Sequence, residues 1–511
     1  MPEILYMNKK LFVLTILFIT IFTGCCCIKN NGKNGNLSSA TLYDGKIDRL
    51  SPFGVFCDSE SKNGRLNLDS AVELGNKKAR LILRWDFVEP KKGKFNFTLP
   101  DRVIDMHLQA GISLLVTVDC ISPWGTRKKV NNLKNFTASP PLDMTDYENF
   151  LKTVVSRYKG KVQYWQIGNE IFDNRLLPPA FWDGTKEEYI ELLIHSYNTI
   201  KKTDPDAKVV IAGFAHELFN KILYNKPPGL VEQEKVRDFF EYIMNKGNKY
   251  CDAVDFHQYY EPDHVYGIMK LLKETMKKYD FKKDIINTEA GDFDIRLFGE
   301  HFLYGDNNIP VISELLEIPE ITDKVKSTMK GGVQRQEFID FAKFLKKNEK
   351  GRIIIERYQS ENLLKRISLT LSLGVKEIYW ASIKDSNTPI DWYWTIMSLC
   401  DESGRKKPHF YTYKLTIRKL EHFTKAEEIA FTTPVKVIKF TFRDKGPVFI
   451  IWNDEGDKKI DFSGHVSSSN IKITHIITEQ NETDKDAKIE ILPADSIQVN
   501  KRPIFLEEVD K

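Results

Sequence analysis

The sequence of 511 residues has little of several features that define particular classes of protein. Seven cysteines are too few for a scaffold built from disulfides. The 75 basic and 71 acidic residues leave a formal net charge of +4, which argues against a dedicated nucleic-acid binder. No CxxC pair and no cluster of metal ligands is evident, and the Gly-rich loops of nucleotide-binding folds are missing. The sequence therefore predicts no metal and no cofactor.

Long apolar runs are also scarce, and the clearest one is at the N-terminus. Lys9 and Lys10 precede an apolar run from Leu11 to Phe22, and Thr23-Gly24-Cys25 follows. This order is typical of an export signal, and the run is short for a membrane span of about 20 residues. Phe22 to Cys25 resembles a bacterial lipobox, which predicts a signal peptide over residues 1–24 and a lipid anchor at Cys25. An uncleaved membrane anchor and plain secretion are the alternatives, and all three export the body of the protein.

Residues 25–45 are predicted to form a flexible linker because Asn30 to Ser39 is rich in Asn, Gly, Lys and Ser. The whole chain is 41% hydrophobic, which is enough to fill a hydrophobic core. Four cysteines remain in the body, namely Cys57, Cys120, Cys251 and Cys400. A bridge between Cys57 and Cys120 and four buried free thiols are both compatible with the sequence.

Residues 46–425 alternate short β-branched runs with longer amphipathic stretches, which indicates parallel strands with crossover helices. Eight such units predict an α/β fold of the (β/α)8 TIM barrel type. A long excursion, Asp292 to about Ile353, separates the seventh strand from the helix before the eighth, and it would lie on the active face. The predicted strands are Gly54–Cys57, Ala79–Trp85, Ser113–Asp119, Val162–Gly168, Lys208–Gly213, Ala253–Tyr259, Asp284–Glu289 and Val375–Ala381.

The composition changes after about Ala426, and residues 426–511 are predicted to form a small antiparallel β-sandwich. Short alternating or apolar runs are separated there by turns such as Arg443 to Gly446. The predicted strands are Val435–Phe442, Pro447–Trp452, Asp457–Phe462, Asn470–Ile477 and Lys488–Leu492.

Two predicted barrel strands end in a glutamate. One apolar strand stops at Gly168-Asn169-Glu170, and another runs into Thr288-Glu289. Because barrel strands place their carboxyl ends on the catalytic face, the two carboxyls are expected on the same rim. A pair of carboxyls suits glycoside cleavage, in which one group donates a proton and the other attacks the anomeric carbon or activates water.

With these motifs the sequence resembles glycoside hydrolase clan A, the retaining β-glycosidases on TIM barrels, with similarity to families 39, 5 and 42. The resemblance covers about Ser51 to Glu421. It is carried by Ala79-Arg80-Leu81, Trp85 to Gly93, Gly168-Asn169-Glu170, Phe256-His257-Gln258-Tyr259, Thr288-Glu289 and Ile378-Tyr379-Trp380.

The resemblance implies that Glu170 is the general acid and base and that Glu289 is the nucleophile. Arg80 would keep Glu289 ionised, since an opposite charge lowers a carboxyl pKa, and Tyr259 would donate to the same carboxylate. Asn169 would hold the sugar 2-hydroxyl. The other substrate-binding residues that the resemblance implies are His257, Trp380 as an aromatic floor, and Trp124 in the loop after the third strand.

Alternatives remain at several of these positions. Arg84 shares strand parity with Arg80, so either arginine is a candidate for the catalytic face. His257 also fits a hydrogen-bonded rim histidine, Trp380 fits the barrel core, and Trp124 fits loop packing. His216, which follows the fifth strand, and Trp392 and Trp394, which follow the eighth, each fit either the site or packing, whereas Glu89 favours a structural role.

The sequence therefore predicts an exported β-glycoside hydrolase with a carbohydrate substrate and no nucleic-acid partner. A carbohydrate-binding or scaffold protein on an inactive barrel is one alternative, and a transglycosylase acting on exopolysaccharide is another. Retention of configuration requires the two carboxyls to lie about 5–5.5 Å apart, whereas about 8 Å would suit inversion. The sugar, its linkage, endo or exo action and the oligomeric state are not determined by the sequence.

Overall fold

A computed structural model describes residues 50–57, 64–127, 137–172, 181–225, 232–259, 261–292, 310–328, 335–385, 394–431 and 434–509. The predicted signal peptide, the linker and Cys25 lie outside these residues, as does Trp392. Within the described ranges no helix combines the length and the apolar character that crossing a membrane requires. Cys57, Cys120, Cys251 and Cys400 are buried free thiols, so the proposed bridge between Cys57 and Cys120 is not formed.

Eight parallel strands close into a barrel in the order β1 to β8, with β1 paired to β8, which confirms the predicted TIM barrel. Their bounds lie within three residues of the predicted ones. The strands are β1 (Phe53–Phe56), β2 (Lys78–Arg84), β3 (Ser113–Asp119), β4 (Tyr164–Asn169), β5 (Lys208–Gly213), β6 (Ala253–Gln258), β7 (Asp284–Ala290) and β8 (Ile378–Trp380).

Helices connect successive strands and surround the barrel, and their ends carry local signals. Asp143 caps α4 by accepting from the Thr145 amide, and Thr185 and Glu188 form a capping box at the start of α5. The larger helices are α1 (Gly64–Leu74), α3 (Thr98–Gln109), α4 (Met144–Arg157), α5 (Lys186–Thr203), α7 (Gln233–Gly247), α8 (His264–Lys278), α13 (Glu349–Ser372) and α15 (Pro408–Leu420). Short ones are α2 (Trp85–Val88), α6 (His216–Tyr224) and α14 (Trp394–Met397).

The barrel interior is layered because alternate residues of each strand point inward. At the amino-terminal ends of the strands, Lys78 Nζ lies 2.7 Å from Glu377 Oε1, and both side chains are buried. An apolar layer lies in the same interior and consists of Leu115, Tyr164, Val210, Ala253, Ile286 and Tyr379. The inward positions nearer the carboxyl ends are polar and lead into the two glutamates.

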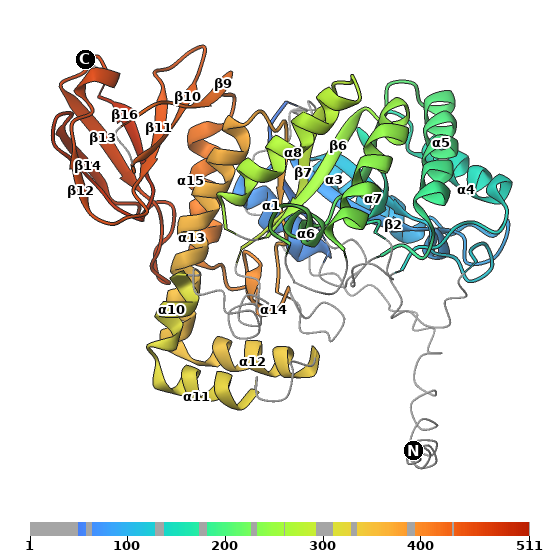
Figure 1. Ribbon diagram of the computed structural model, residues 1–511, viewed down its shortest axis with the longest axis horizontal. Coiled ribbons are helices and arrows are strands. Elements are labelled where there is room, and N and C mark those ends of the chain that lie inside the picture. Colours follow the sequence, from blue (N-terminus) through green and yellow to red (C-terminus); the bar gives the residue numbers. More distant parts are fainter. Residues whose placement is uncertain are drawn as a thin grey trace, which may run out of the picture. The chain divides into compact units, whose positions relative to one another are not determined.

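The segment between β7 and β8 contains additional helices. They are α10 (Pro310–Leu316), α11 (Pro319–Thr328) and α12 (Arg335–Lys347), and they gather beside the first turns of α13 (Figure 1). A separate apolar core holds this group together and includes Leu315, Ile321, Phe341 and Leu345 with Ile355 of α13.

The C-terminal part forms a six-stranded antiparallel sheet in the order β14-β13-β16-β11-β10-β9 and a two-stranded sheet of β12 and β15. Val437, Phe449, Ile473 and Ile497 belong to one buried core that both sheets share, which agrees with the predicted sandwich. The strands are β9 (Lys425–Glu428), β10 (Lys436–Thr441), β11 (Val448–Trp452), β12 (Lys458–Ile460), β13 (Asn470–His475), β14 (Ile489–Pro493), β15 (Ile497–Val499) and β16 (Ile504–Glu508). The strands β9, β15 and β16 are not among those predicted from the sequence.

Candidate active site

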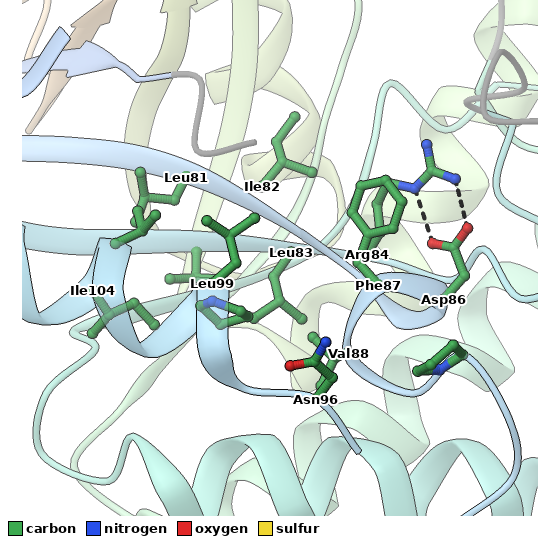
Figure 2. A pocket seen from close by; sticks show the side chains of 14 residues that line it. Leu81, Ile82, Leu83, Arg84, Asp86, Phe87, Val88, Asn96, Leu99 and Ile104 are labelled. Carbon is green, nitrogen blue, oxygen red and sulfur yellow. Dashed lines mark hydrogen bonds and ion pairs between the residues drawn. The ribbon is translucent and has the colours of Figure 1, made fainter. Parts of the chain in front are cut away.

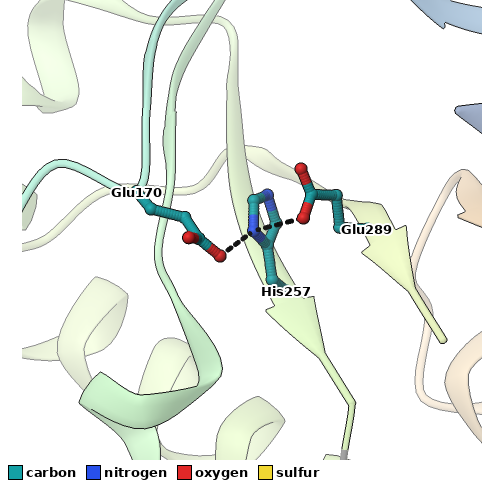
Figure 3. Close-up of side chains that lie close together, drawn as sticks. All are labelled: Glu170, His257 and Glu289. Carbon is teal, nitrogen blue, oxygen red and sulfur yellow. Dashed lines mark hydrogen bonds and ion pairs between the residues drawn. The ribbon is translucent and has the colours of Figure 1, made fainter. Parts of the chain in front are cut away.

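The two predicted catalytic glutamates meet at the carboxyl ends of the barrel strands. Glu289 lies in β7, and Glu170 follows directly on β4, where Gly168 and Glu170 both have positive φ (78° and 43°). This left-handed backbone turns the chain sharply at the end of the strand. One oxygen of Glu170, one oxygen of Glu289 and a ring nitrogen of His257 all lie within 4.8 Å of one another (Figure 3).

His257 of β6 lies between the two carboxyls and is fully buried. Its Nδ1 is 2.7 Å from Glu170 Oε1 and 3.4 Å from Glu289 Oε2 (Figure 3). Its Nε2 is 3.2 Å from Thr288 Oγ1. Although burial lowers the pKa of His257, the charge of Glu289 and the contacts with Asp255 and Glu170 raise it to about 10. The imidazole is therefore a cation at neutral pH, shared by the two glutamates.

Glu289 is held by two further donors. Arg80 Nη1 donates to Glu289 Oε1 at 2.5 Å, and the Tyr259 hydroxyl donates to Oε2. Burial alone would raise the pKa of Glu289, but the charges of His257 and Arg80 and the hydrogen bonds from Tyr259 and Arg80 lower it below its ordinary value. Glu289 is therefore ionised at neutral pH, as a nucleophile must be.

Glu170 has the opposite electrostatic environment. Burial raises its pKa above the ordinary value, and His257 opposes this shift, whereas the charges of Glu289 and Glu217 add to it. Two carboxyls whose surroundings move their pKa values in opposite directions are suited to separate roles, one as proton donor and one as anion.

A layer of polar side chains beneath the carboxyls positions them. Arg80 also donates from Nη2 to Asn169 Oδ1 at 2.6 Å and from Nε to Thr117 Oγ1 at 2.9 Å. Thr117 donates to Gln166 Oε1 at 2.6 Å, and Gln166 Nε2 donates to Asp255 Oδ2 at 2.5 Å. This chain of bonds crosses from β2 to β6 inside the barrel and makes the orientation of Arg80 depend on several strands.

Asp255 closes the layer on the far side. It accepts from the Thr288 amide at 2.8 Å and from the Thr288 hydroxyl at 2.5 Å, and Thr288 in turn contacts His257. Thr117, Gln166, Asp255 and Thr288 are not among the site residues predicted from the sequence. The feature that could have identified them is a polar residue at an inward-facing position of an otherwise apolar strand.

Several predicted positions have other surroundings. Trp380 is buried, with its ring centroid 6.4 Å from that of Tyr413 and 6.5 Å from that of His409, both on α15. The prediction of an aromatic floor at Trp380 is therefore wrong. The reason is strand parity, because Tyr379 belongs to the interior layer and its neighbour must face the helices.

Trp124 is anchored in the loop after β3. Its Nε1 donates to the Glu89 carbonyl at 2.9 Å, and its ring meets that of Trp85 at 5.2 Å. No contact among the described residues joins Trp124 to the two carboxyls, so its role in substrate binding stays a prediction. The Glu89 carboxylate accepts from Trp85 Nε1 at 2.8 Å and from the Gly93 amide at 2.6 Å, which suits the structural role expected for it.

The choice between the two arginines of β2 is also clear in the structure. Arg80 contacts Glu289, whereas Arg84 forms a bidentate pair with Asp86 through Nε to Oδ1 at 3.0 Å and Nη2 to Oδ2 at 2.7 Å.

His216, the first residue of α6, packs its ring against that of Tyr259, with the ring centroids 5.4 Å apart. Trp394 begins α14.

The cluster of Glu170, His257 and Glu289 also has the ligand types that a metal ion uses. Its charges disfavour a cation, however. The Arg80 guanidinium already occupies Glu289 Oε1, and the raised pKa of His257 keeps the ring protonated rather than free to coordinate. The arrangement is better suited to proton transfer and to attack by a carboxylate.

A separate cavity of about 520 Å³ lies beside β2, α2 and α3 (Figure 2). Leu81, Leu83, Leu99 and Ile104 make its lining mostly apolar, and the Arg84–Asp86 pair is at one side. Neither of the two glutamates lines it, so it is not the site of the carboxyl chemistry.

The chain is similar to known glycoside hydrolases. Residues 73–231 match the family model described as glycosyl hydrolase family 10. Endo-1,4-beta-xylanase A of Phanerodontia chrysosporium is 28% identical over 166 residues, which are 31% of this chain and 39% of that enzyme. Endo-1,4-beta-xylanase 3 of Hypocrea jecorina is 27% identical over 165 residues, 31% of this chain and 43% of that enzyme. The chain thus spans about two fifths of these relatives.

Solved structures show the same fold over most of the chain. A family 39 glycoside hydrolase from Bacteroides cellulosilyticus WH2 has a TM-score of 0.55 at 16% identity and covers 89% of this chain and 80% of its own. A family 39 β-xylosidase from Caulobacter crescentus has a TM-score of 0.53 at 14% identity and covers 90% and 96%. Together with the family model, these findings confirm the resemblance to glycoside hydrolase clan A.

Proposed function

We propose that the protein is a β-glycoside hydrolase that acts on a β-linked poly- or oligosaccharide by a retaining double displacement. The observation that carries the proposal is the carboxyl pair, in which one oxygen of Glu170 lies within 4.8 Å of one oxygen of Glu289 while the two pKa values move in opposite directions. So close an approach fits the carboxyl separation of roughly 5–5.5 Å in retaining enzymes better than the spacing of about 6.5–9.5 Å that leaves room for water in inverting ones.

In the first step Glu289 attacks the anomeric carbon while Glu170 gives its proton to the leaving oxygen. Glu170 is then a carboxylate 2.7 Å from the His257 cation, which stabilises the new charge. In the second step Glu170 removes a proton from water, which attacks the glycosyl–enzyme ester and releases Glu289.

Xylan is the first substrate to test, because the relatives are named as endo-1,4-β-xylanases and a structural neighbour is named as a β-xylosidase. Transglycosylation would use the same covalent intermediate with a sugar as acceptor. An inactive carbohydrate-binding barrel would need a defect other than loss of the glutamates, since both are in place.

The test is reducing-end release from a panel of β-linked polysaccharides that includes xylan. We expect Glu289→Gln and Glu170→Gln to lower the rate on the responding polymer by about 10³-fold or more, since each removes a group that acts in the transition state. Glu241→Gln is the matched control and should keep full activity, since Glu241 lies on α7 and pairs with Lys278 of α8. Release that both site variants leave unchanged would discard the site. The anomer formed first, followed by NMR, would report retention or inversion.

We also propose that the protein is exported and carries a lipid anchor at Cys25. The order of Lys9, Lys10, the apolar run Leu11 to Phe22 and Thr23-Gly24-Cys25 supports this proposal. An anchored hydrolase would stay close to polysaccharide at the cell surface.

A further inference from the structure

A third carboxyl lies at the mouth of the barrel, at the carboxyl end of β3. Asp119 is the last residue of β3, and its inward direction follows from strand parity, because Leu115 lies in the interior layer and Thr117 contacts Arg80. Its side chain is therefore on the same rim as the two glutamates. Only 7% of Asp119 is exposed, so the carboxyl is well buried.

Asp119 has cations nearby but accepts no side-chain hydrogen bond from them. Arg84 is its register partner on β2, yet Arg84 Nε and Nη2 are directed to Asp86. The nitrogens of Arg80 donate to Thr117, Glu289 and Asn169. Across the described ranges of the chain, no hydrogen bond reaches the carboxyl oxygens of Asp119.

A buried carboxylate without a donor is costly, so a donor from a ligand is the natural complement. Burial raises the pKa of Asp119 to about 6, with Arg80 and Arg84 opposing the shift and Asp86 and Glu289 adding to it. At neutral pH the group is therefore mostly ionised and has two acceptor oxygens. Adjacent hydroxyls of a sugar ring are donors of matching spacing for such a carboxylate.

We propose that Asp119 is a substrate-binding residue that accepts hydrogen bonds from ring hydroxyls of the sugar held over Glu170 and Glu289. The inference rests on the proposed glycosidase function and specifies a determinant of which sugar that site takes. A sugar without a hydroxyl at the contacted carbon would leave the carboxylate unpaired, and specificity of this kind is strong because a buried polar group loses its partner.

The test compares the wild type with Asp119→Ala on 4-nitrophenyl β-D-xyloside and on its 3-deoxy and 4-deoxy analogues. We expect one deoxy analogue to lower kcat/KM of the wild type by about 10- to 100-fold, the range for a hydrogen bond to a charged group. On the parent xyloside, kcat/KM of Asp119→Ala should be lower than that of the wild type by a similar factor. Replacing the parent xyloside by that deoxy analogue should then lower kcat/KM of Asp119→Ala little further. If every analogue costs both enzymes the same factor, the proposal is overturned.

Binding measurements separate this proposal from the proposed function. Titration calorimetry with xylotetraose would compare Glu289→Gln with the double variant Glu289→Gln, Asp119→Ala, and we expect affinity to fall at least about tenfold in the double variant. If the wild type cleaves the xyloside but each deoxy analogue lowers kcat/KM of both enzymes by the same factor, only the role of Asp119 is overturned. A wild type that releases no reducing ends from any polymer of the panel and binds none of these probes would overturn both proposals.

A matched control guards against a general folding defect. Asp204 is also buried, but it follows α5 near the amino-terminal ends of the strands and accepts from the Gly160 amide at 2.9 Å. Asp204→Ala should lower the thermal unfolding midpoint without changing the deoxy pattern. If it reproduces the Asp119→Ala pattern, the effect is structural and the proposal fails.

Discussion

At the scale of single residues, Glu170 and Glu289 are the same amino acid in two different environments. Glu289 receives a guanidinium and a phenol hydroxyl, whereas the close polar partner of Glu170 is the imidazole of His257. Glu289 is buried and only 12% of the Glu170 side chain is exposed, so burial acts on both in the same direction and the neighbours determine the difference. In the proposed mechanism, Arg80, Tyr259 and His257 therefore determine which glutamate acts as acid and which as nucleophile.

Tyr259→Phe tests this account of the nucleophile. The hydroxyl stabilises ionised Glu289, so its removal should raise the pKa of that carboxyl toward its ordinary value. The acidic limb of the kcat/KM profile should then move to higher pH by about one unit, since about 1.4 kcal/mol corresponds to one pKa unit. The measurement is the pH dependence of kcat/KM on the substrate that responds in the polysaccharide panel.

Tyr379→Phe is the control for the loss of a buried phenol. Its hydroxyl donates to Glu377 at 2.7 Å, in the interior layers away from the carboxyl pair. It should leave the acidic limb in place. A Tyr259→Phe profile identical with that of the wild type would contradict the assigned effect of this hydrogen bond on Glu289.

At the scale of elements, a barrel strand shapes the site in two ways: its inward-facing residues enter the site, and its own side chains limit the space left for residues of the adjacent strand. β6 directs Asp255 and His257 into the site, and β5 next to it leaves the space that they occupy. That space exists because β5 ends in Gly213. A Cβ there would lie 2.6 Å from Asp255 Oδ2 and inside contact distance of the His257 ring. Position 213 therefore requires glycine because a larger side chain would collide with Asp255 and His257, and not because of its backbone conformation.

Gly213→Ala should therefore displace His257 and lower kcat by about 100-fold or more, because small misplacements of catalytic groups are costly. Overpacking should also reduce stability by about 1–3 kcal/mol. Gly446→Ala is the matched control, since a Cβ at Gly446 meets nothing within 4 Å. The measurements are kcat and the urea unfolding midpoint. Full activity in Gly213→Ala would show that the ring has room to move.

At the scale of the whole molecule, the barrel and the C-terminal sheet share a core. Ile438, Phe440, Ile450 and Trp452 of the sheet belong to the same buried cluster as the barrel and its helices. Lys365 of α13 also bonds to Asp454 at 2.6 Å, and Thr412 of α15 donates to the Ile477 carbonyl at 3.0 Å. This shared burial makes the sheet a structural support of the barrel.

The proposed export and lipid anchor rest on the N-terminal residues, and Cys25→Ala tests the anchor. If Cys25 carries lipid, the full-length protein should incorporate labelled palmitate and sediment with membranes, because two acyl chains or more hold a protein firmly at a bilayer. Cys25→Ala should lose the label. Labelling that persists in Cys25→Ala would contradict the anchor at this residue, and Cys57→Ala is a control that keeps Cys25.

Much of this organisation could be predicted from the sequence. Eight strand runs, the pair Asn169-Glu170 and the pair Thr288-Glu289 are local patterns, and the carboxyl ends of parallel strands must share a face. The central strand β16 was missed, because five residues ending in two glutamates carry little periodicity and depend on pairing with β11 and β13. Trp380 was misplaced because a three-residue strand leaves its parity undetermined.

The sequence by itself determined the closed barrel, the two glutamates and the residue types around them, since strand periodicity and strand ends are local properties of the chain. Only the tertiary structure decided that Arg80 rather than Arg84 holds Glu289, that His257 joins both carboxyls, and that Asp119 is buried without a donor. These facts depend on register across β2, β3, β6 and β7. Barrel closure sets that register, and neighbours in space across the barrel are far apart in the chain.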